Sequence, residues 1–143
     1  MKLFVIAAIA SAVCVAQPPA EKASGAAYRA IVQEAQAHVK RVDVQQFQTL
    51  RQAHPDFVFI DVRESEEWVK GHAAKALHIS RGMLEKEIEG KVPAKDTTIV
   101  LYCHSGARSA LAAESLVRMG YRNAYSLDGG LTAYEAAGLP MEK

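Results

Sequence analysis

A cysteine stands where the sequence changes from a strand pattern to a helix pattern. Residues 97–102 are β-branched and apolar, which is typical of a buried parallel strand, and residues 109–119 carry apolar side chains at helical spacing. Cys103 therefore lies at a predicted strand-to-helix turn, where unpaired N–H groups and the positive end of the helix dipole stabilise an anion. These surroundings favour a reactive thiolate over an inert buried thiol.

The residues after Cys103 suit the binding of a small anion. We expect their backbone amides to surround the thiolate and the group that it attacks. Gly106 allows the positive φ that a tight anion cradle needs. Arg108 falls in the first helical turn, where the dipole disfavours a cation, so it either pairs with a bound anion, orients the loop or extends into solvent. The predicted anion-binding residues are His104, Ser105, Gly106, Ala107, Arg108 and Ser109.

Two polar side chains of this loop, those of His104 and Ser109, have interpretations that involve no direct role in the reaction. His104 neighbours the cysteine, yet adjacent residues at a turn usually point apart, so we expect it to shape the mouth of the pocket rather than to act as a general base. Ser109 is most simply a helix-capping or loop hydroxyl, with direct contact to a substrate as the alternative.

Strand and helix patterns alternate along the chain, which predicts an α/β layered fold with a mainly parallel sheet. Strand patterns occur around Val42 and at residues 57–60, 76–79, 97–102 and 123–127, and helical patterns at 26–40, 43–53, 65–70, 83–89, 109–119 and 131–137. Asp43 and Gln46 form a predicted capping box. Asp61, Cys103 and Asp128 each follow a strand and precede a helix, so we expect them at one edge of the sheet, where such sheets bind ligands.

The first residues have the pattern of a secretory signal peptide. Lys2 supplies a positive charge, residues 3–10 are apolar, and small residues follow, with cleavage expected after Ala16. The apolar run is too short to span a bilayer. Cleavage before Cys14 with lipidation is the less favoured alternative, because Val13 is a poor residue at that position. The sequence thus predicts a periplasmic or secreted protein.

A linker and an extra helix follow within residues 17–40, ahead of the main domain. Tyr28, Ile31, Ala35 and Val39 fall on one face of this helix, which either packs on the domain or forms a dimer contact.

Composition argues against several classes of partner. The chain has 17 Lys and Arg against 16 Asp and Glu and no basic block, so neither nucleic acid nor an anionic membrane is an expected partner. The five histidines are scattered and the two cysteines lack zinc spacing, so we expect neither a metal nor a cofactor. Removal of Cys14 with the signal peptide would leave Cys103 as a lone thiol.

These residues resemble the rhodanese domain, specifically its small, exported, single-domain members. The resemblance covers about residues 39–140, and the domain itself is placed at 41–141. Its strongest parts are Asp61-Val62-Arg63-Glu64, Glu67-Trp68-Val69-Lys70-Gly71-His72, the cysteine loop and Leu127-Asp128-Gly129-Gly130-Leu131. Cys103 to Arg108 also has the six-residue length of the family's active loop. The resemblance implies a central, mainly parallel five-stranded sheet with helices on both faces.

The resemblance also implies thiosulfate-type sulfurtransferase activity. A sulfur atom would pass from thiosulfate or a similar donor to cyanide, a thiol or a protein acceptor through a persulfide on Cys103, with Cys103 and Arg108 as catalytic residues. We expect Asp61 and Arg63 to fix loops by ion pairing, and the resemblance suggests that His72 is a structural histidine hydrogen-bonded under the loop.

The chain departs from the family pattern in two places. The stretch after His72 lacks most of the usual residues, and Tyr134 stands where the family usually has Trp. We expect these departures to change local packing more than catalysis. Trp68 and Phe47 are interpreted as core residues.

Two alternative functions are weighed against sulfur transfer. Cysteine phosphatases and arsenate reductases use a similar loop, but those that resemble this fold carry one more residue between cysteine and arginine, so Cys103–Arg108 is too short for them. The second alternative is a persulfide carrier or binding module that holds sulfur for a partner protein with little turnover. The sequence does not exclude this alternative.

Overall fold

The computed structural model describes residues 25–143. The predicted signal peptide, Cys14 and most of the linker lie outside these residues. From Gly25 onward, no helix combines the length and the apolar character that a membrane crossing requires.

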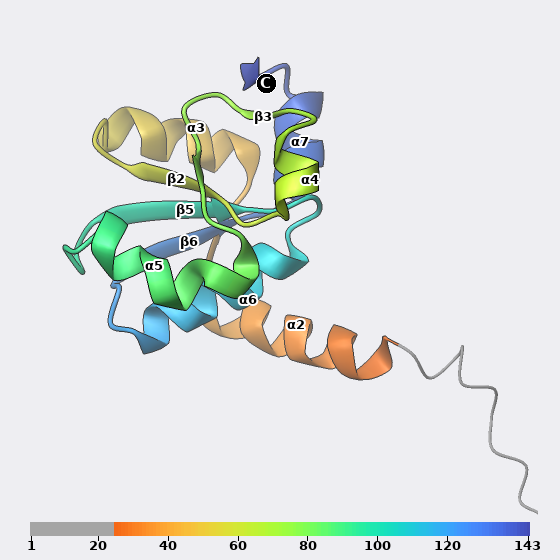
Figure 1. Cartoon of the computed structure of the whole chain (residues 1–143), viewed down its shortest axis with the longest axis vertical. Helices are drawn as coiled ribbons and strands as arrows, with labels where there is room; N and C mark the ends of the chain where they lie inside the picture. The colour runs from red at the N-terminus through yellow and green to blue at the C-terminus, as the bar shows by residue number, and fades with distance from the viewer. Residues whose placement is uncertain (1–24) are drawn as a thin grey trace, which may run out of the picture.

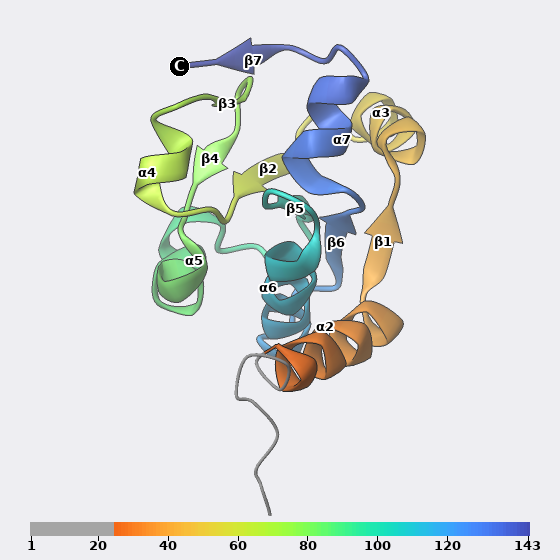
Figure 2. The same cartoon turned by 90° about the vertical axis from the view of Figure 1, so that its right-hand side faces the viewer.

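Five parallel strands form the main sheet, in the order β1-β6-β5-β2-β4. They are Lys40–Val42 (β1), Val58–Asp61 (β2), Leu77–His78 (β4), Thr98–Tyr102 (β5) and Asn123–Leu127 (β6). Figure 2 shows these strands following one another across the sheet, with β5 at the centre. The predicted five-stranded parallel sheet is therefore confirmed.

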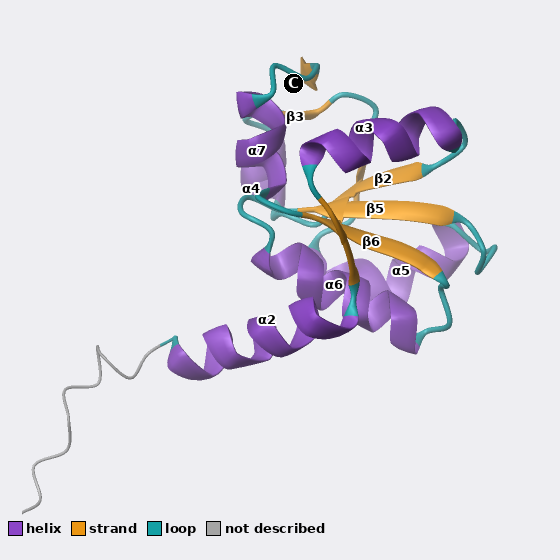
Figure 3. Cartoon of the chain, turned by 180° about the vertical axis from the view of Figure 1, so that it is seen from behind, coloured by secondary structure: helices purple, strands orange, loops and turns teal. Residues whose placement is uncertain are grey.

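Helices cover both faces of this sheet, as predicted. They are Ala26–His38 (α2), Val44–Ala53 (α3), Ser65–Trp68 (α4), Leu84–Lys91 (α5), Ala107–Arg118 (α6) and Gly130–Ala136 (α7), with a 3-10 turn at Arg81–Met83 (η1). In Figures 1 and 3, α3 lies on one side of the sheet, and α2, α5 and α6 lie on the other.

The side chains of β5 alternate between two hydrophobic cores. Ile99 and Leu101 pack among residues of α5 and α6, whereas Val100 and Tyr102 pack among residues of α3 and α7. All four are fully buried. Because successive side chains of a strand point to opposite faces, one continuous apolar run fills both cores.

An aromatic cluster fills the core beneath α3 and α7. The Phe59 ring lies 4.8 Å from Phe47, 4.7 Å from Tyr102 and 5.8 Å from Tyr134, measured between centroids. The Tyr134 hydroxyl donates to the carbonyl of Pro140 at 3.0 Å. Tyr134 thus takes a packed position and satisfies its polar group by bonding the C-terminal segment.

The predicted start of α3 is confirmed in detail. The Asp43 carboxylate accepts from the Gln46 amide at 2.8 Å, and the Gln46 side chain accepts from the Asp43 amide at 3.0 Å. This reciprocal capping box satisfies two amides that the helix leaves unpaired. The helix ends at Ala53, just before His54 and Pro55.

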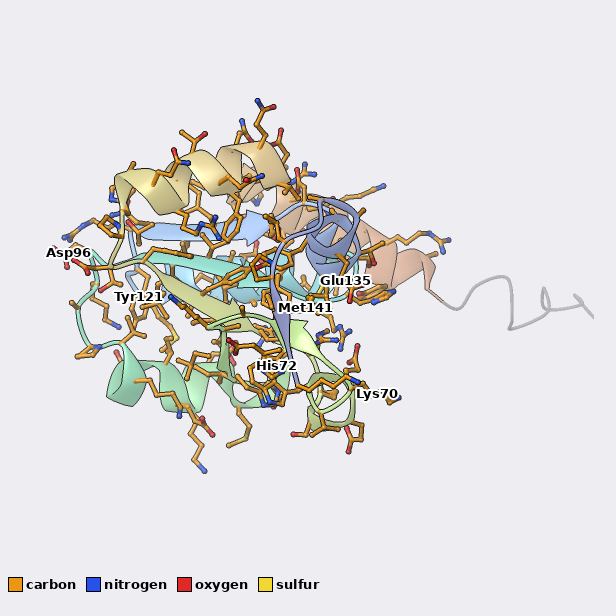
Figure 4. The ribbon with its side chains drawn as sticks, turned by 90° about the horizontal axis from the view of Figure 1, so that it is seen from above. Lys70, His72, Asp96, Tyr121, Glu135 and Met141 are labelled. Atoms are coloured by element: carbon orange, nitrogen blue, oxygen red, sulfur yellow. The ribbon has the colours of Figure 1, made fainter. Side chains whose placement is uncertain are left out.

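A small second sheet was not predicted from the sequence. His72–Ala73 (β3) pairs antiparallel with Met141–Glu142 (β7), so the C-terminal segment crosses beside the main sheet. Figure 4 places His72 and Met141 near each other and away from Asp96 and Tyr121, which lie at the left of the view. A two-residue strand is too short to show a periodic sequence pattern.

The predicted apolar face of α2 is confirmed only toward its C-terminal end. Ala35 is buried together with Val32, and Val39 packs against the core just after the helix, whereas Tyr28 and Ile31 are 46% and 51% exposed. In Figure 3, the N-terminal part of α2 extends beyond the sheet, away from the other elements of residues 25–143. The helix also ends at His38, two residues earlier than expected.

Substitutions of the neighbouring residues Val32 and Ile31 test which face of α2 is buried. We expect Val32→Ala to lower the free energy of unfolding by about 2 kcal/mol, because it removes buried methyl groups. Ile31→Ala should change it by less than about 0.5 kcal/mol. Urea denaturation of both variants measures the difference, and a larger loss for Ile31→Ala would restore the face that the sequence predicted.

Candidate active site

The cysteine loop connects the central strand β5 to helix α6. Cys103 directly follows β5, and α6 begins at Ala107, two residues earlier than predicted. Gly106 precedes the helix with φ at 101°, a left-handed conformation that glycine adopts without strain. The sequence expectation of a strand-to-helix turn with a positive φ at Gly106 is confirmed.

The sulfur of Cys103 lies beneath this loop. The Gly106 amide donates to Sγ at 3.1 Å. The residue is only 1% exposed, so the thiol is more enclosed than an open loop would make it. His104 and Ser105, by contrast, are exposed at the surface of the loop.

Five other loop amides have no acceptor among residues 25–143. They are the N–H groups of His104, Ser105, Ala107, Arg108 and Ser109. The last three belong to the first turn of α6, where a helix leaves its amides unpaired. Unpaired N–H groups at the start of a helix carry partial positive charge and suit an anion. Anion binding by residues 104–109 stays a prediction.

The start of α7 fixes the direction of the loop. The amides of Leu131 and Thr132 donate to the carbonyls of Cys103 and His104 at 2.8 and 3.2 Å, and the Thr132 hydroxyl donates to the His104 carbonyl at 3.0 Å. In a trans peptide the C=O and the following N–H point in opposite directions. With the two carbonyls turned toward α7, the amides of His104 and Ser105 point away from it.

This close approach requires glycine at position 130. A Cβ placed there would collide with the Cys103 carbonyl and would lie 2.8 Å from the His104 carbonyl carbon. Its φ of 55° is also left-handed. The Gly129-Gly130 pair, one of the motifs on which the resemblance rests, thus allows the backbone of α7 to contact the backbone of the cysteine loop.

Substitution of Gly130 tests whether this contact shapes the loop. The free energy of unfolding of Gly130→Ala should be about 1–3 kcal/mol lower than that of Gly138→Ala, and any activity that depends on Cys103 should fall with it, because the added methyl group displaces the loop backbone. Gly138 is a matched control, since its φ is 68° and nothing lies within 4 Å of its Cβ position. Thermal unfolding and activity of both variants give the comparison; equal effects would contradict the contact.

Ser109 supports the loop from below. Its hydroxyl is fully buried, donates to the Gly106 carbonyl at 3.1 Å and lies 2.9 Å from the Ser126 hydroxyl. The side chain thus links the loop to β6. This agrees with the loop-hydroxyl interpretation, and the Ser109 amide, in the first turn of α6, has no acceptor among residues 25–143.

Arg108 is held by an acidic side chain of another segment. Its Nη1 and Nη2 donate to Glu67 Oε2 and Oε1 at 2.6 and 2.8 Å, and both side chains are about one-third exposed. The hydrogen bonds from Arg108 lower the pKa of Glu67 to about 2. Conversely, the hydrogen bonds and charge of Glu67, and then the charge of the Cys103 thiolate, raise the pKa of Arg108.

Sequence reasoning missed Glu67 as a partner of the loop. The local pattern shows it only as the third residue of α4, where its side chain accepts from the Glu64 amide at 3.2 Å in a capping box. Its contact with Arg108 spans 41 positions of the chain. An acidic residue inside a motif of the resemblance was the one available signal.

The predicted ion pairing of Asp61 and Arg63 is observed, and the two residues pair with each other. Arg63 Nη2 donates to Asp61 Oδ2 at 2.7 Å and to the Gly71 carbonyl at 2.8 Å. Burial opposes the charge of Arg63, but hydrogen bonding and attraction to Asp61 outweigh burial and raise its pKa. The pair is buried and links the end of β2 to the segment after α4. Asp128, at the same edge, instead binds Arg41 at 2.7 Å.

His72 bonds within its own segment. Its Nδ1 lies 3.3 Å from the Trp68 carbonyl, and its ring stacks on Trp68 with centroids 3.4 Å apart. His78 also stacks on Trp68, at 4.8 Å, and its Nε2 donates to the Arg63 carbonyl at 2.9 Å. His72 is therefore structural, as expected, but it supports α4 and β3. Trp68 is half-buried between imidazoles rather than a core residue.

Residues 25–143 contain no group of three or more His, Cys, Asp and Glu side chains placed to hold a metal ion. The chemistry available at the loop is that of one sulfur, a set of backbone amides and a paired arginine.

The fold and the loop define a class of α/β domains that hold a cysteine in an amide-lined loop at the carboxyl edge of a parallel sheet. Within this class, the rhodanese-like domain family matches residues 43–137. That match covers more than half of the chain, so the chain belongs to the rhodanese-like family.

Curated relatives fall into two groups. A thiosulfate sulfurtransferase GlpE of Coxiella burnetii is 35% identical over 81 residues, which cover 57% of this chain and 74% of that protein. A tRNA uridine(34) hydroxylase of Pectobacterium carotovorum is 34% identical over 96 residues, or 62% of this chain. The chain spans only 27% of the length of that hydroxylase, so the likeness concerns one domain of a larger protein.

Two solved structures resemble the chain over most of its length. The polysulfide-sulfur transferase homodimer of Wolinella succinogenes has a TM-score of 0.72 and 28% identity, covering 87% of this chain and 93% of that one. A protein of unknown function from Rhodopseudomonas palustris, described as a possible tyrosine phosphatase, has a TM-score of 0.71 and 31% identity, covering 80% and 93%.

Proposed function

We propose that the protein is a sulfurtransferase that carries a sulfur atom as a persulfide on Cys103. Its donor is thiosulfate or a similar sulfane-sulfur anion, and its acceptor is cyanide, a thiol or a protein. The observation that carries this proposal is the cysteine beneath a loop whose amides lack acceptors in residues 25–143. Membership of the rhodanese-like family, with relatives named as thiosulfate and polysulfide-sulfur transferases, supports the same chemistry.

The reaction takes place in two displacement steps. The Cys103 thiolate attacks the outer sulfur of thiosulfate, a new S–S bond forms, and sulfite leaves with the electron pair of the broken bond. The acceptor, for example cyanide, then attacks the terminal sulfur of the persulfide, forms thiocyanate and restores the thiolate. No proton is exchanged in either step, so the mechanism needs no general base, and His104 has no required role.

The amides of the loop stabilise both anionic states. The thiolate and the terminal sulfur of the persulfide each carry negative charge within reach of partial positive charges that are already oriented by α7 and α6. Because the orientation exists before the donor arrives, no reorganisation is needed when charge moves from one sulfur to the next.

Replacement of the nucleophile tests the proposal directly. Cys103→Ser should abolish thiocyanate formation from thiosulfate and cyanide, and mass spectrometry should find the mass of one added sulfur on the wild-type protein only. A serine variant that keeps its activity would rule out the persulfide mechanism. An aryl phosphate offered in parallel tests the phosphatase alternative; phosphate release without thiocyanate formation would favour that alternative.

A persulfide carrier uses the same residues, so turnover separates it from an enzyme. Stoichiometric loading of Cys103 by thiosulfate with negligible steady-state transfer to cyanide or a small thiol would favour a carrier for a partner protein. Rapid transfer to either small acceptor favours the enzyme.

Arg108 is the second residue to test. Arg108→Ala removes the cation of the loop and leaves the Glu67 carboxylate without its positively charged partner, so kcat/KM for thiosulfate should fall on the order of tenfold or more. The free energy of unfolding should change by only about 1 kcal/mol, because the pair is partly exposed. Arg118→Ala, at the exposed far end of α6, is the matched control and should leave both quantities unchanged.

We also propose that the protein acts outside the cytoplasm, on the basis of the signal-peptide pattern in residues 1–16.

A further inference from the structure

Both arginines near the cysteine loop are already neutralised by carboxylates. Arg63 is bonded to Asp61 in a buried pair, and Arg108 is bonded to Glu67 by two hydrogen bonds. Each ion pair has no net charge. Near the loop, the structure therefore offers partial charges from amides but no uncompensated arginine.

Glu67 holds Arg108 firmly in this arrangement. Each carboxylate oxygen accepts from a different guanidinium nitrogen, which is the bidentate geometry of strong arginine–carboxylate pairs. Oε2 also accepts from the Glu64 amide, so the carboxylate is fixed by α4 as well. The pKa of Glu67, about 2, keeps the side chain charged at every ordinary pH.

The Arg108–Glu67 ion pair affects which donor charge the site binds best. Thiosulfate carries two negative charges, of which one resides mainly on the sulfonate oxygens. An arginine free to reach these oxygens would stabilise them, but Arg108 can do so only by giving up or sharing Glu67. The Glu67 carboxylate at the same time repels the second charge. A donor with one negative charge, on the sulfur to be transferred, avoids both costs.

We infer that Glu67 is a specificity-determining residue that turns the loop toward singly charged sulfur donors, namely thiosulfonates and organic persulfides, and away from doubly charged thiosulfate. The inference rests on the proposed function and concerns the same cysteine. With a thiosulfonate, the Cys103 thiolate takes the terminal sulfur and a sulfinate leaves with the bonding electron pair. With an organic persulfide, the leaving group is a thiolate.

Two donors that differ by one charge test this inference. Thiosulfate and methanethiosulfonate both present a terminal sulfur on a sulfonyl sulfur, but a methyl group replaces one charged oxygen in the second. The quantity to measure is the ratio of kcat/KM for thiosulfate to kcat/KM for methanethiosulfonate. In Glu67→Gln this ratio should rise about tenfold over wild type, because Arg108 becomes available to the dianion and one repelling charge is gone.

Glu66→Gln is the matched control. Glu66 lies next to Glu67 on α4, is exposed and forms no ion pair among residues 25–143. Its substitution removes the same charge from the same helix and should leave the ratio unchanged. Glu67→Asp keeps the charge, and its ratio should stay close to wild type even if the shorter side chain weakens the pair. Thermal unfolding of each variant shows whether the fold is kept.

Several outcomes would overturn the inference. An unchanged ratio in Glu67→Gln, with both donors slowed equally, would mean that Glu67 only positions the loop. If the ratio rises equally in Glu66→Gln, the effect comes from the total negative charge of α4 and not from the Glu67 side chain in particular. If the wild-type protein uses neither donor, the proposed function itself fails; if it uses both donors and the ratio does not respond to Glu67→Gln, the inference alone fails.

Discussion

The cysteine loop depends on the hydrogen bonds that the start of α7 donates to the carbonyls of Cys103 and His104. These bonds turn the carbonyl side of the loop toward α7 and leave its amide side to the sulfur and its ligands. Gly130 permits the contact because any side chain would enter the space of the loop backbone. The sheet contributes by bringing β5 and β6 into register, so that the segments that follow them meet at one edge. The double glycine therefore shapes the site although neither residue carries a functional group.

The site contains two kinds of positive charge that could bind an anion, and they lie in different places. Backbone amides supply oriented partial charges close to Cys103, while the full charges of Arg63 and Arg108 are paired with carboxylates a short distance away. Paired arginines keep their geometry at little electrostatic cost, and they join the loop to α4 and the end of β2 to the segment before β3. The same arrangement that makes these connections rigid also limits how strongly the loop attracts a second negative charge.

Much of the fold could be predicted from the sequence because its signals are local. The apolar run of β5, the Asp43 capping box and the glycine of the cysteine loop each depend on neighbours a few positions away. The remaining features depend on distant partners. The contact between Glu67 and Arg108 and the pairing of β3 with β7 join segments far apart in the chain. The predicted face of α2 is buried only toward its C-terminal end, because apolar periodicity shows which side of a helix is apolar, not how far the helix extends past the domain.

Trp68 is the single tryptophan of the chain, and it stacks between the rings of His72 and His78 beside Glu67. Indole emission is sensitive to the protonation of stacked imidazoles and to movement of the helix that carries it. Helix α4, which carries Glu67 and so binds Arg108, therefore also carries an intrinsic fluorophore. Its tryptophan fluorescence reports on this one position of the chain without an added label.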